Sequence, residues 1–367
     1  MPPPASRQKK SVKKGIQFTL MVVGASGTGR TTFVNTLVDE KGWLAHADSS
    51  DPMAAAEGKP QIKVEKKTLE LDEDGVHIRL TVCDAPGFGD NIDNESAFAT
   101  IVGYLEKQYD VLLAEESRIK RNPRLEDQRV HALLYFIPPT GHSLREMDIE
   151  LMKRLSPRVN VIPVIGKADS LTPSELKGFK ERIMQDIEHY QIPVYNFPFD
   201  PEEDDDDVIA ENSELRAMLP FAIVGSEDEI EVGGELVRAR RYPWGIVQVD
   251  NPSHSDFLRL RTALLSTHLA DLKEITHDFL YENYRTQALS RGNADQLDQS
   301  IQPDDMANQS FRIKEEQLRK EEEKLKEIEL RVQREISEKR QELLAKEESL
   351  RNMEARLTHA SSGPLDG

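Results

Sequence analysis

The stretch VVGASGTGRTTFVNTL, Val22–Leu37, constrains the fold of this chain more than any other. Gly24, Gly29 and Thr31 occupy positions of the phosphate-binding pattern G-x-x-x-x-G-K-[ST], with Arg30 where the pattern has lysine. The apolar residues before this loop predict a buried strand, and those after it predict a helix. A strand, a glycine loop and a helix in this order indicate an α/β protein that binds a phosphate-bearing ligand.

The backbone of the loop is expected to enclose the phosphates. Glycines let N–H groups turn inward on an anion, and the start of the following helix adds its positive end. The predicted nucleotide contacts in the loop are Gly24, Ala25, Ser26, Gly27, Thr28, Gly29, Arg30, Thr31 and Thr32. The alternative is a glycine-rich turn that follows a strand by chance and binds nothing.

Arg30 is the departure from the pattern. Lysine is a compact point charge that can follow the phosphates during transfer, whereas arginine is a bulkier planar fork. Arginine still binds phosphate well. We therefore expect nucleotide binding to survive at this loop where catalysis does not.

Further patterns extend this unit into a sheet. Residues 61–87 alternate in polarity around Asp74-Gly75 and predict a hairpin. Continuous apolar runs at 132–137, 159–166 and 221–225 are typical of central parallel strands, and helical stretches separate them. The sequence therefore predicts a P-loop, doubly wound, mostly parallel α/β sheet.

A different texture follows this predicted sheet. A β-rich piece contains a predicted turn at Gly233-Gly234 and the residues Tyr242-Pro243-Trp244-Gly245. A long helix is then predicted from about Ser255 to Tyr284.

A second motif, Asp84-Ala85-Pro86-Gly87, ends the second strand of the predicted hairpin. The Asp84 carboxylate and the Thr31 hydroxyl are predicted to hold Mg²⁺, and the Gly87 N–H to face the γ-phosphate. The same four residues are also a common turn, so the prediction depends on their place downstream of the glycine loop.

A third motif, Gly166-Lys167-Ala168-Asp169, ends a buried strand. The stem of Lys167 is expected to lie over a purine ring. The Asp169 carboxylate accepts two hydrogen bonds, and guanine offers the matching pair of donors that adenine lacks. This motif therefore predicts GTP or GDP rather than an adenine nucleotide, because the wrong base would leave a buried carboxylate unpaired.

Composition excludes other classes of function. A net charge of −18 over 367 residues argues against general nucleic-acid binding. The single cysteine, Cys83, excludes an intrachain disulfide and is typical of a cytosolic protein. We predict no secretory signal and no transmembrane segment, because no apolar run approaches the roughly 18 residues that a membrane-spanning helix needs.

Composition also divides the chain. Residues 1–14 form a basic segment, 15–290 a globular nucleotide-binding domain, 291–310 a polar linker, 311–357 a charged helix and 358–367 a disordered tail. Apolar residues in the charged helix recur at intervals of seven and four, which predicts a coiled coil. The alternative is a solvated helix without a partner, which gains little from burial.

With the three motifs in place, residues 15–290 resemble a septin, a filament-forming GTP-binding protein. The resemblance is carried by GASGTGRTTF, CDAPGFGD, RVHALLYFIPPTGHSL, GKADSLTPSE, and RRYPWGIVQVDNPSHSDFLRLR followed by HDFLYENYR. The last two belong to an element at about 229–290 that ordinary small GTPases lack. The loop arginine and LADLKEITHDFLYENYRTQALSR look most like the fungal group at the ends of septin hetero-octamers.

The resemblance implies further site residues. Gly225 would offer backbone to the base, and Arg240 would stack over it. His142 and Trp244 would lie at the subunit interface that buries the nucleotide. The alternative for Trp244 is an aromatic side chain in the core or in a turn.

The resemblance also implies partners and a location. The protein would be cytoplasmic and cytoskeletal, at the cell cortex, septum or division site, joined to other septin subunits and to coiled-coil partners. The membrane-facing residues would be Lys9, Lys10, Lys13 and Lys14, against an anionic phosphoinositide surface. The alternative for this basic run is a disordered, solubilising tail.

The first switch departs from the family pattern as well. Hydrolysing septins place a threonine a few residues before the second strand, and here that position falls at or near Gln61, in a stretch without threonine. Together with Arg30, this absence predicts slow or absent GTP hydrolysis, because phosphoryl transfer needs positioned water, metal and charge together.

Three hypotheses follow. The main one is a structural subunit with GTP as a buried interface cofactor. The second is a catalytically active GTPase switch. The third, a P-loop kinase, is opposed by Asp169 and by the YPWG element.

Overall fold

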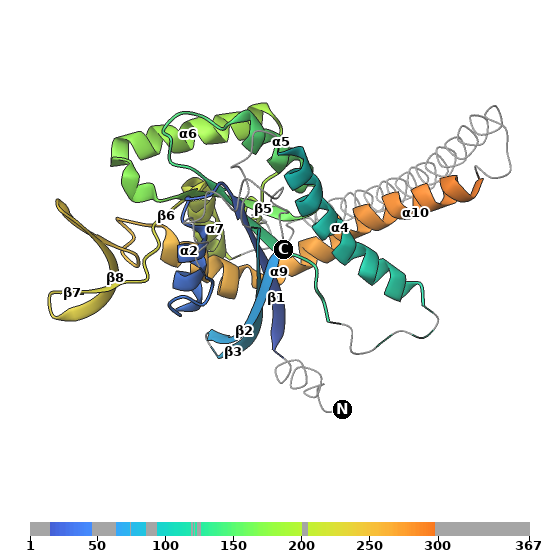
Figure 1. The fold of residues 1–367 in the computed structure, drawn as a ribbon, viewed down its shortest axis with the longest axis horizontal. Coiled ribbons are helices and arrows are strands. Elements are labelled where there is room, and N and C mark those ends of the chain that lie inside the picture. Colours follow the sequence, from blue (N-terminus) through green and yellow to red (C-terminus); the bar gives the residue numbers. More distant parts are fainter. Residues whose placement is uncertain are drawn as a thin grey trace, which may run out of the picture. The chain divides into compact units, whose positions relative to one another are not determined.

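A six-stranded sheet forms the centre of the computed structural model (Figure 1). The structure describes residues 15–45, 64–73, 75–85, 94–118, 120, 122, 126–199 and 205–297, with side chains to residue 290. The predicted basic segment, switch position Gln61, Gly87, the coiled coil and the tail lie outside the described residues.

The order of the strands in this sheet is β2-β3-β1-β4-β5-β6. Their bounds are β1 Ile16–Gly24, β2 Glu65–Glu73, β3 Val76–Asp84, β4 Ala132–Ile137, β5 Asn160–Gly166 and β6 Phe221–Ile223. Only β2, at one edge, is antiparallel to its neighbour. The chain moves outward in opposite directions from β1, so the carboxyl end of β1 is the switch point where such sheets bind ligands. The predicted doubly wound, mostly parallel sheet is confirmed.

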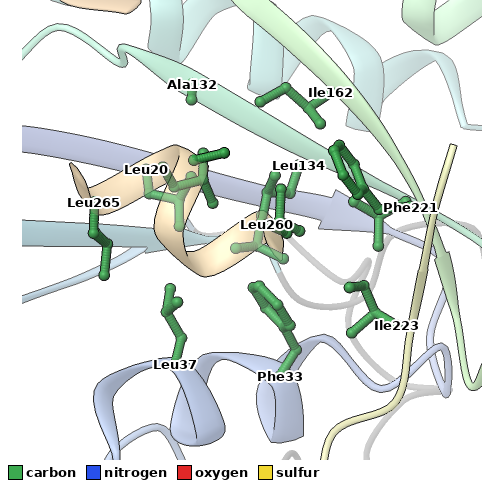
Figure 2. Close-up of a cluster of buried hydrophobic side chains, with 14 of the residues drawn as sticks. Leu20, Phe33, Leu37, Ala132, Leu134, Ile162, Phe221, Ile223, Leu260 and Leu265 are labelled. Carbon is green, nitrogen blue, oxygen red and sulfur yellow. The ribbon is translucent and has the colours of Figure 1, made fainter. Parts of the chain in front are cut away.

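Helices cover both faces of the sheet, and the alternation along β1 explains why. Leu20 and Val22 belong to one apolar cluster, and Met21 and Val23 belong to the other. The second cluster includes residues of α4 (Glu95–Glu116), α5 (Glu146–Leu155) and α6 (Pro173–His189). The first includes residues of α7 (Asp206–Met218). It also includes residues of α2 (Arg30–Val38) and of the helices after residue 256, such as Phe33, Leu37 and Leu260 in Figure 2.

A smaller, three-stranded sheet follows the main one in sequence. It consists of β7 (Glu229–Val232), β8 (Glu235–Tyr242) and β9 (Gly245–Gln248), all antiparallel. The predicted turn lies between β7 and β8, where both glycines have positive φ angles, 65° at Gly233 and 92° at Gly234. Two positive φ angles in succession favour glycine, because it adopts them without steric cost.

The predicted helix from Ser255 to Tyr284 forms with interruptions. Its segments are α8 (Phe257–Thr262), the π-helical η2 (Ala263–Thr267), α9 (Leu269–Glu274), the π-helical η3 (Ile275–Tyr281) and α10 (Glu282–Leu297). The backbone remains helical to Leu297, beyond the position at which we expected a linker to begin. Nowhere in the described part of the chain is a helix both long and apolar enough to cross a membrane.

A buried polar hub joins the start of β5 to these C-terminal helices. The Asn160 side-chain amide donates to the backbone carbonyls of His131 (2.8 Å) and Leu272 (3.1 Å) and to the Thr276 hydroxyl (3.1 Å). Each acceptor is buried, so the amide satisfies groups that would otherwise be costly to remove from water.

The imidazole of His131 belongs to the same hub and is fully buried. Its Nδ1 accepts the Thr19 backbone N–H at 2.9 Å, and its Nε2 donates to Asp127 Oδ2 at 3.3 Å. A ring nitrogen that accepts carries no proton, so this imidazole is neutral. Burial lowers the pKa of His131 below its ordinary value, against the opposing effect of Asp127.

We expect the protein to lose stability as the pH falls below about 6.5. In that window the unfolded chain protonates His131 and the folded chain does not, so the unfolded state binds more protons. The contribution is at most roughly 1.4 kcal/mol per pH unit and is measured by urea unfolding across a pH series. His131→Asn, whose side-chain oxygen can replace Nδ1 as acceptor, should flatten the profile. A variant with the wild-type slope would contradict the assignment.

Candidate functional site

A cavity of about 480 Å³ opens at the carboxyl ends of the central strands. Its walls come from the glycine loop and α2, from the ends of β4, β5 and β6, and from β8. The lining residues are Thr28, Gly29, Thr32, Phe33, Phe136, Gly166, Lys167, Ile223, Gly225, Ser226, Glu227, Asp228, Arg240, Arg241 and Tyr242. The volume and position suit a small-molecule ligand such as a nucleotide.

Two strand ends must be glycine for the loop to lie against the sheet. A Cβ added to Gly24 would lie 2.5 Å from the carbonyl oxygen of Phe136. One added to Gly166 would lie 2.2 Å from the carbonyl oxygen of Thr28. Both contacts are closer than real Cβ atoms allow, so the loop position depends on the absence of these side chains.

The loop itself has the shape predicted for an anion cradle. Gly27 and Gly29 take positive φ angles of 74° and 91°, and the Thr28 hydroxyl closes the turn by donating to the Ala25 carbonyl at 2.7 Å. Ser26 is exposed, whereas Thr31 and Thr32 at the start of α2 are half-buried. Backbone N–H groups at a helix start in this conformation bind phosphate.

Arg30 does not point along the cavity. Its Nη1 donates to Asp84 Oδ1 at 3.1 Å and to the Ala85 carbonyl at 2.8 Å, and only 8% of the Arg30 and Asp84 side chains is exposed. Burial raises the pKa of the Asp84 carboxyl, an effect that the Arg30 charge and the Ala85 N–H oppose. The carboxylate predicted to bind Mg²⁺ with Thr31 is therefore already paired with a cation, an arrangement that fits a metal poorly.

The base-recognition motif has its own internal partners. Lys167 takes a positive φ angle of 50°. The aliphatic part of its side chain lies next to Gly29, and both residues line the cavity. The Asp169 carboxylate, whose side chain is 2% exposed, pairs with Arg240 Nη1 at 3.0 Å and accepts from the Tyr242 hydroxyl. Burial, followed by this hydrogen bond, raises the pKa of Tyr242 to about 12.

Gly225, which was predicted to offer its backbone to the base, lines the cavity two residues after β6. A Cβ there would approach the Phe33 backbone N to 3.2 Å, so this side of the cavity is closely packed. The predicted residues Gly29, Lys167, Gly225 and Arg240 thus surround one cavity, and Asp169 contacts it through Arg240 and Tyr242.

The small sheet is fastened to the far end of α2. Glu227 accepts from the Asn35 side chain at 2.9 Å and from the Gly42 N–H at 3.2 Å. Arg238 donates to the Thr36 carbonyl at 2.9 Å and pairs with Asp39 at 3.1 Å. These contacts fix the position of β8, which carries the cavity residues Arg240 and Tyr242.

The two predicted interface residues do not line the cavity. Trp244, in the β8–β9 turn, is 79% exposed and stacks on Tyr242 with ring centroids 4.9 Å apart. It is therefore not a core aromatic. His142 is exposed, and its carbonyl accepts from Arg182 at 2.8 Å.

Sequence reasoning missed several residues of the cavity, namely Ser226, Glu227, Asp228, Arg241 and Tyr242. The segment after β6 carries no chemical motif of its own. Tyr242 was noted only as part of YPWG, and its bond to Asp169 spans 73 residues of sequence. A polar residue two positions after Arg240 on the same strand was the only available signal, since such residues share a face.

Comparison with known proteins identifies the family. The family model described as septin matches residues 14–298. The chain belongs to the septin family. Septin homolog spn3 of Schizosaccharomyces pombe is 54% identical over 354 residues, or 96% of this chain and 93% of that protein. Cell division control protein 11 of Saccharomyces cerevisiae is 49% identical over 295 residues, or 78% of this chain and 69% of that protein. These relatives confirm the predicted likeness to fungal septins.

A solved structure supports the same conclusion. The septin GTPase domain of Chlamydomonas reinhardtii matches with a TM-score of 0.56 and 27% identity, over 74% of this chain and 98% of that one. The septin GTPase fold implies that this chain binds a guanine nucleotide. Septin membership implies that it oligomerises with other septin subunits.

Replacing Tyr242 with phenylalanine should strengthen the binding of GDP. Guanine and the Tyr242 hydroxyl compete for the Asp169 carboxylate, and a hydrogen bond to a charged group contributes roughly 1.5–3 kcal/mol, so about a tenfold gain is expected. Isothermal titration calorimetry measures it. Tyr195→Phe, which removes a similar bond to Asp271 away from the cavity, should leave the affinity unchanged. Weaker binding by the Tyr242 variant would mean that the hydroxyl assists the base.

Proposed function

We propose that this septin binds guanine nucleotide at a subunit interface and polymerises into hetero-oligomeric filaments that scaffold cell division, septation and the cell cortex. The observation that carries the proposal is the cavity that gathers the glycine loop, Lys167 and Arg240 beside the exposed Trp244. A nucleotide there would lie next to the surface that a second subunit covers. Contacts through two different faces of one subunit give open filaments.

Slow or absent hydrolysis is part of the proposal. The Arg30 guanidinium pairs with Asp84, so it does not extend toward the space where β- and γ-phosphates would lie. Charge stabilisation of a transferring phosphoryl group requires a cation at that place. The nucleotide is then a lasting component of the interface, and the alternative of a GTPase that cycles between two states is not favoured.

The remaining parts of the proposal concern the ends of the chain. Residues 311–357 would pair with coiled-coil partners, and Lys9, Lys10, Lys13 and Lys14 would contact anionic phosphoinositides at the membrane surface. Each basic residue contributes only about 1 kcal/mol near such a surface, so this contact would matter in a multivalent filament. The proposed location is the cytoplasmic cortex at the septum or division site.

The nucleotide content of the freshly purified protein tests the proposal directly. After denaturation and chromatographic separation, we expect close to stoichiometric nucleotide, mostly GTP. Mostly GDP would favour the GTPase switch, and an empty protein would contradict the nucleotide-bound interface.

Arg30→Lys alone should not restore fast phosphate release, because the switch threonine is also missing from the sequence. A fast Arg30→Lys enzyme would show that the arginine alone blocks hydrolysis.

Asp169→Ala should abolish the preference for guanine over adenine nucleotides. The carboxylate is the acceptor that pairs with the two guanine donors, and unmatched polar groups in such a site discriminate by roughly 10⁴-fold. Competition between GDP and ADP for the stripped protein measures the ratio. Asp228→Ala, at the same cavity but outside the base motif, is the matched control. Unchanged selectivity in the Asp169 variant would remove the assignment.

A further inference from the structure

The contact between Arg30 and Asp84 has a defined place in the fold. Asp84 ends β3, which lies beside β1 in parallel with Val22 opposite Asp84, so the carboxylate lies next to the start of the glycine loop. Arg30 begins α2 directly after that loop. The pair therefore brings together the position where a phosphate-loop lysine stands and the position where a Mg²⁺ ligand was predicted.

The pair is buried and satisfied from more than one side. Arg30 is 8% and Asp84 6% exposed, and the same guanidinium nitrogen donates to the Asp84 carboxylate and to the Ala85 carbonyl. A buried carboxylate without a cation is costly, and a planar fork with several donors holds such a group more firmly than an ammonium does. The guanidinium is thus anchored at β3 by a charge and by a backbone acceptor.

The donors that remain suit a divalent cation poorly. Mg²⁺ requires near-octahedral oxygen ligands, usually one or two carboxylates together with phosphates and water. A metal at Asp84 would also lie within a few ångströms of the Arg30 charge, where like charges in a buried site repel strongly.

We propose that Arg30 replaces the divalent cation, so that the cavity binds guanosine phosphates without Mg²⁺. The inference rests on the proposed nucleotide site. The Arg30 guanidinium occupies and neutralises Asp84, the carboxylate that was predicted to hold the metal, while the N–H groups of the glycine loop hold the phosphate oxygens. Lysine in the same place carries a compact ammonium on a flexible stem, which can follow the phosphates instead of remaining at Asp84, so a lysine variant should need the metal.

The test is the affinity of the full-length, nucleotide-stripped protein for GDP, measured by calorimetry in excess Mg²⁺ and in EDTA. The two dissociation constants of the wild type should agree within about threefold, whereas Arg30→Lys should bind at least about tenfold more weakly in EDTA than in Mg²⁺. The double variant Arg30→Lys with Asp84→Asn should lose that dependence, because the metal-binding carboxylate is gone. Circular dichroism and thermal unfolding identify any variant that fails to fold, and the wild-type comparison decides the question without them.

A second readout follows the metal rather than the nucleotide. With Mn²⁺ in place of Mg²⁺, electron paramagnetic resonance should detect no protein-bound Mn²⁺ in the wild-type complex with GDP and bound Mn²⁺ in Arg30→Lys. GDP binding by the wild type that requires Mg²⁺, or bound Mn²⁺ in its complex, would overturn the role of Arg30 and leave the nucleotide site standing. No GDP binding in either buffer would overturn the inference and the nucleotide part of the proposed function together.

Discussion

The close approach of the phosphate loop to the ends of the parallel strands is the constraint on which the site depends. Gly24 and Gly166 end β1 and β5, and Gly225 lies two residues after β6. A Cβ at these positions would meet the backbone of Phe136, Thr28 and Phe33, respectively, at 3.2 Å or less. The glycine loop and α2 can lie beside the cavity because they pack on Gly166 and Gly225, which carry no side chains. The remaining chemistry, including the two ion pairs, is arranged around that backbone contact.

Much of this arrangement follows from local sequence. Alternating apolar residues predict the hairpin strands β2 and β3, and continuous apolar runs predict the central parallel strands, because the buried faces of a sheet require apolar side chains. The glycine positions give the loop, since positive φ angles there admit little else. The C-terminal helix was predicted from Ser255 to Tyr284, but it continues to Leu297 and contains two π-helical segments that helix propensity does not predict.

The electrostatic pairing could not be predicted from sequence. Arg30 and Asp84 are 54 residues apart, and Asp169 and Arg240 are 71 apart, so no local pattern connects them. From the sequence alone, Asp84 was predicted to bind Mg²⁺ and Asp169 was predicted to bind guanine. In the folded chain each has an arginine partner, because a buried carboxylate is unfavourable unless a cation pairs with it. For Asp84 and Asp169, the sequence therefore suggests ligand binding, and only the fold reveals the ion pair with an arginine.

Helix α2 is nine residues long, about 14 Å, and both of its ends are held by contacts with other parts of the domain. Its first residues continue the phosphate loop, and its last turn is held by Glu227 and Arg238 of the segment that leads to the exposed ring of Trp244. A rigid element of this length cannot tilt at one end without displacing the other. The position of the Trp244 ring on the surface is therefore set by the packing of α2 inside the domain, and the spacing between the glycine loop and Asn35 helps to determine the shape of that surface.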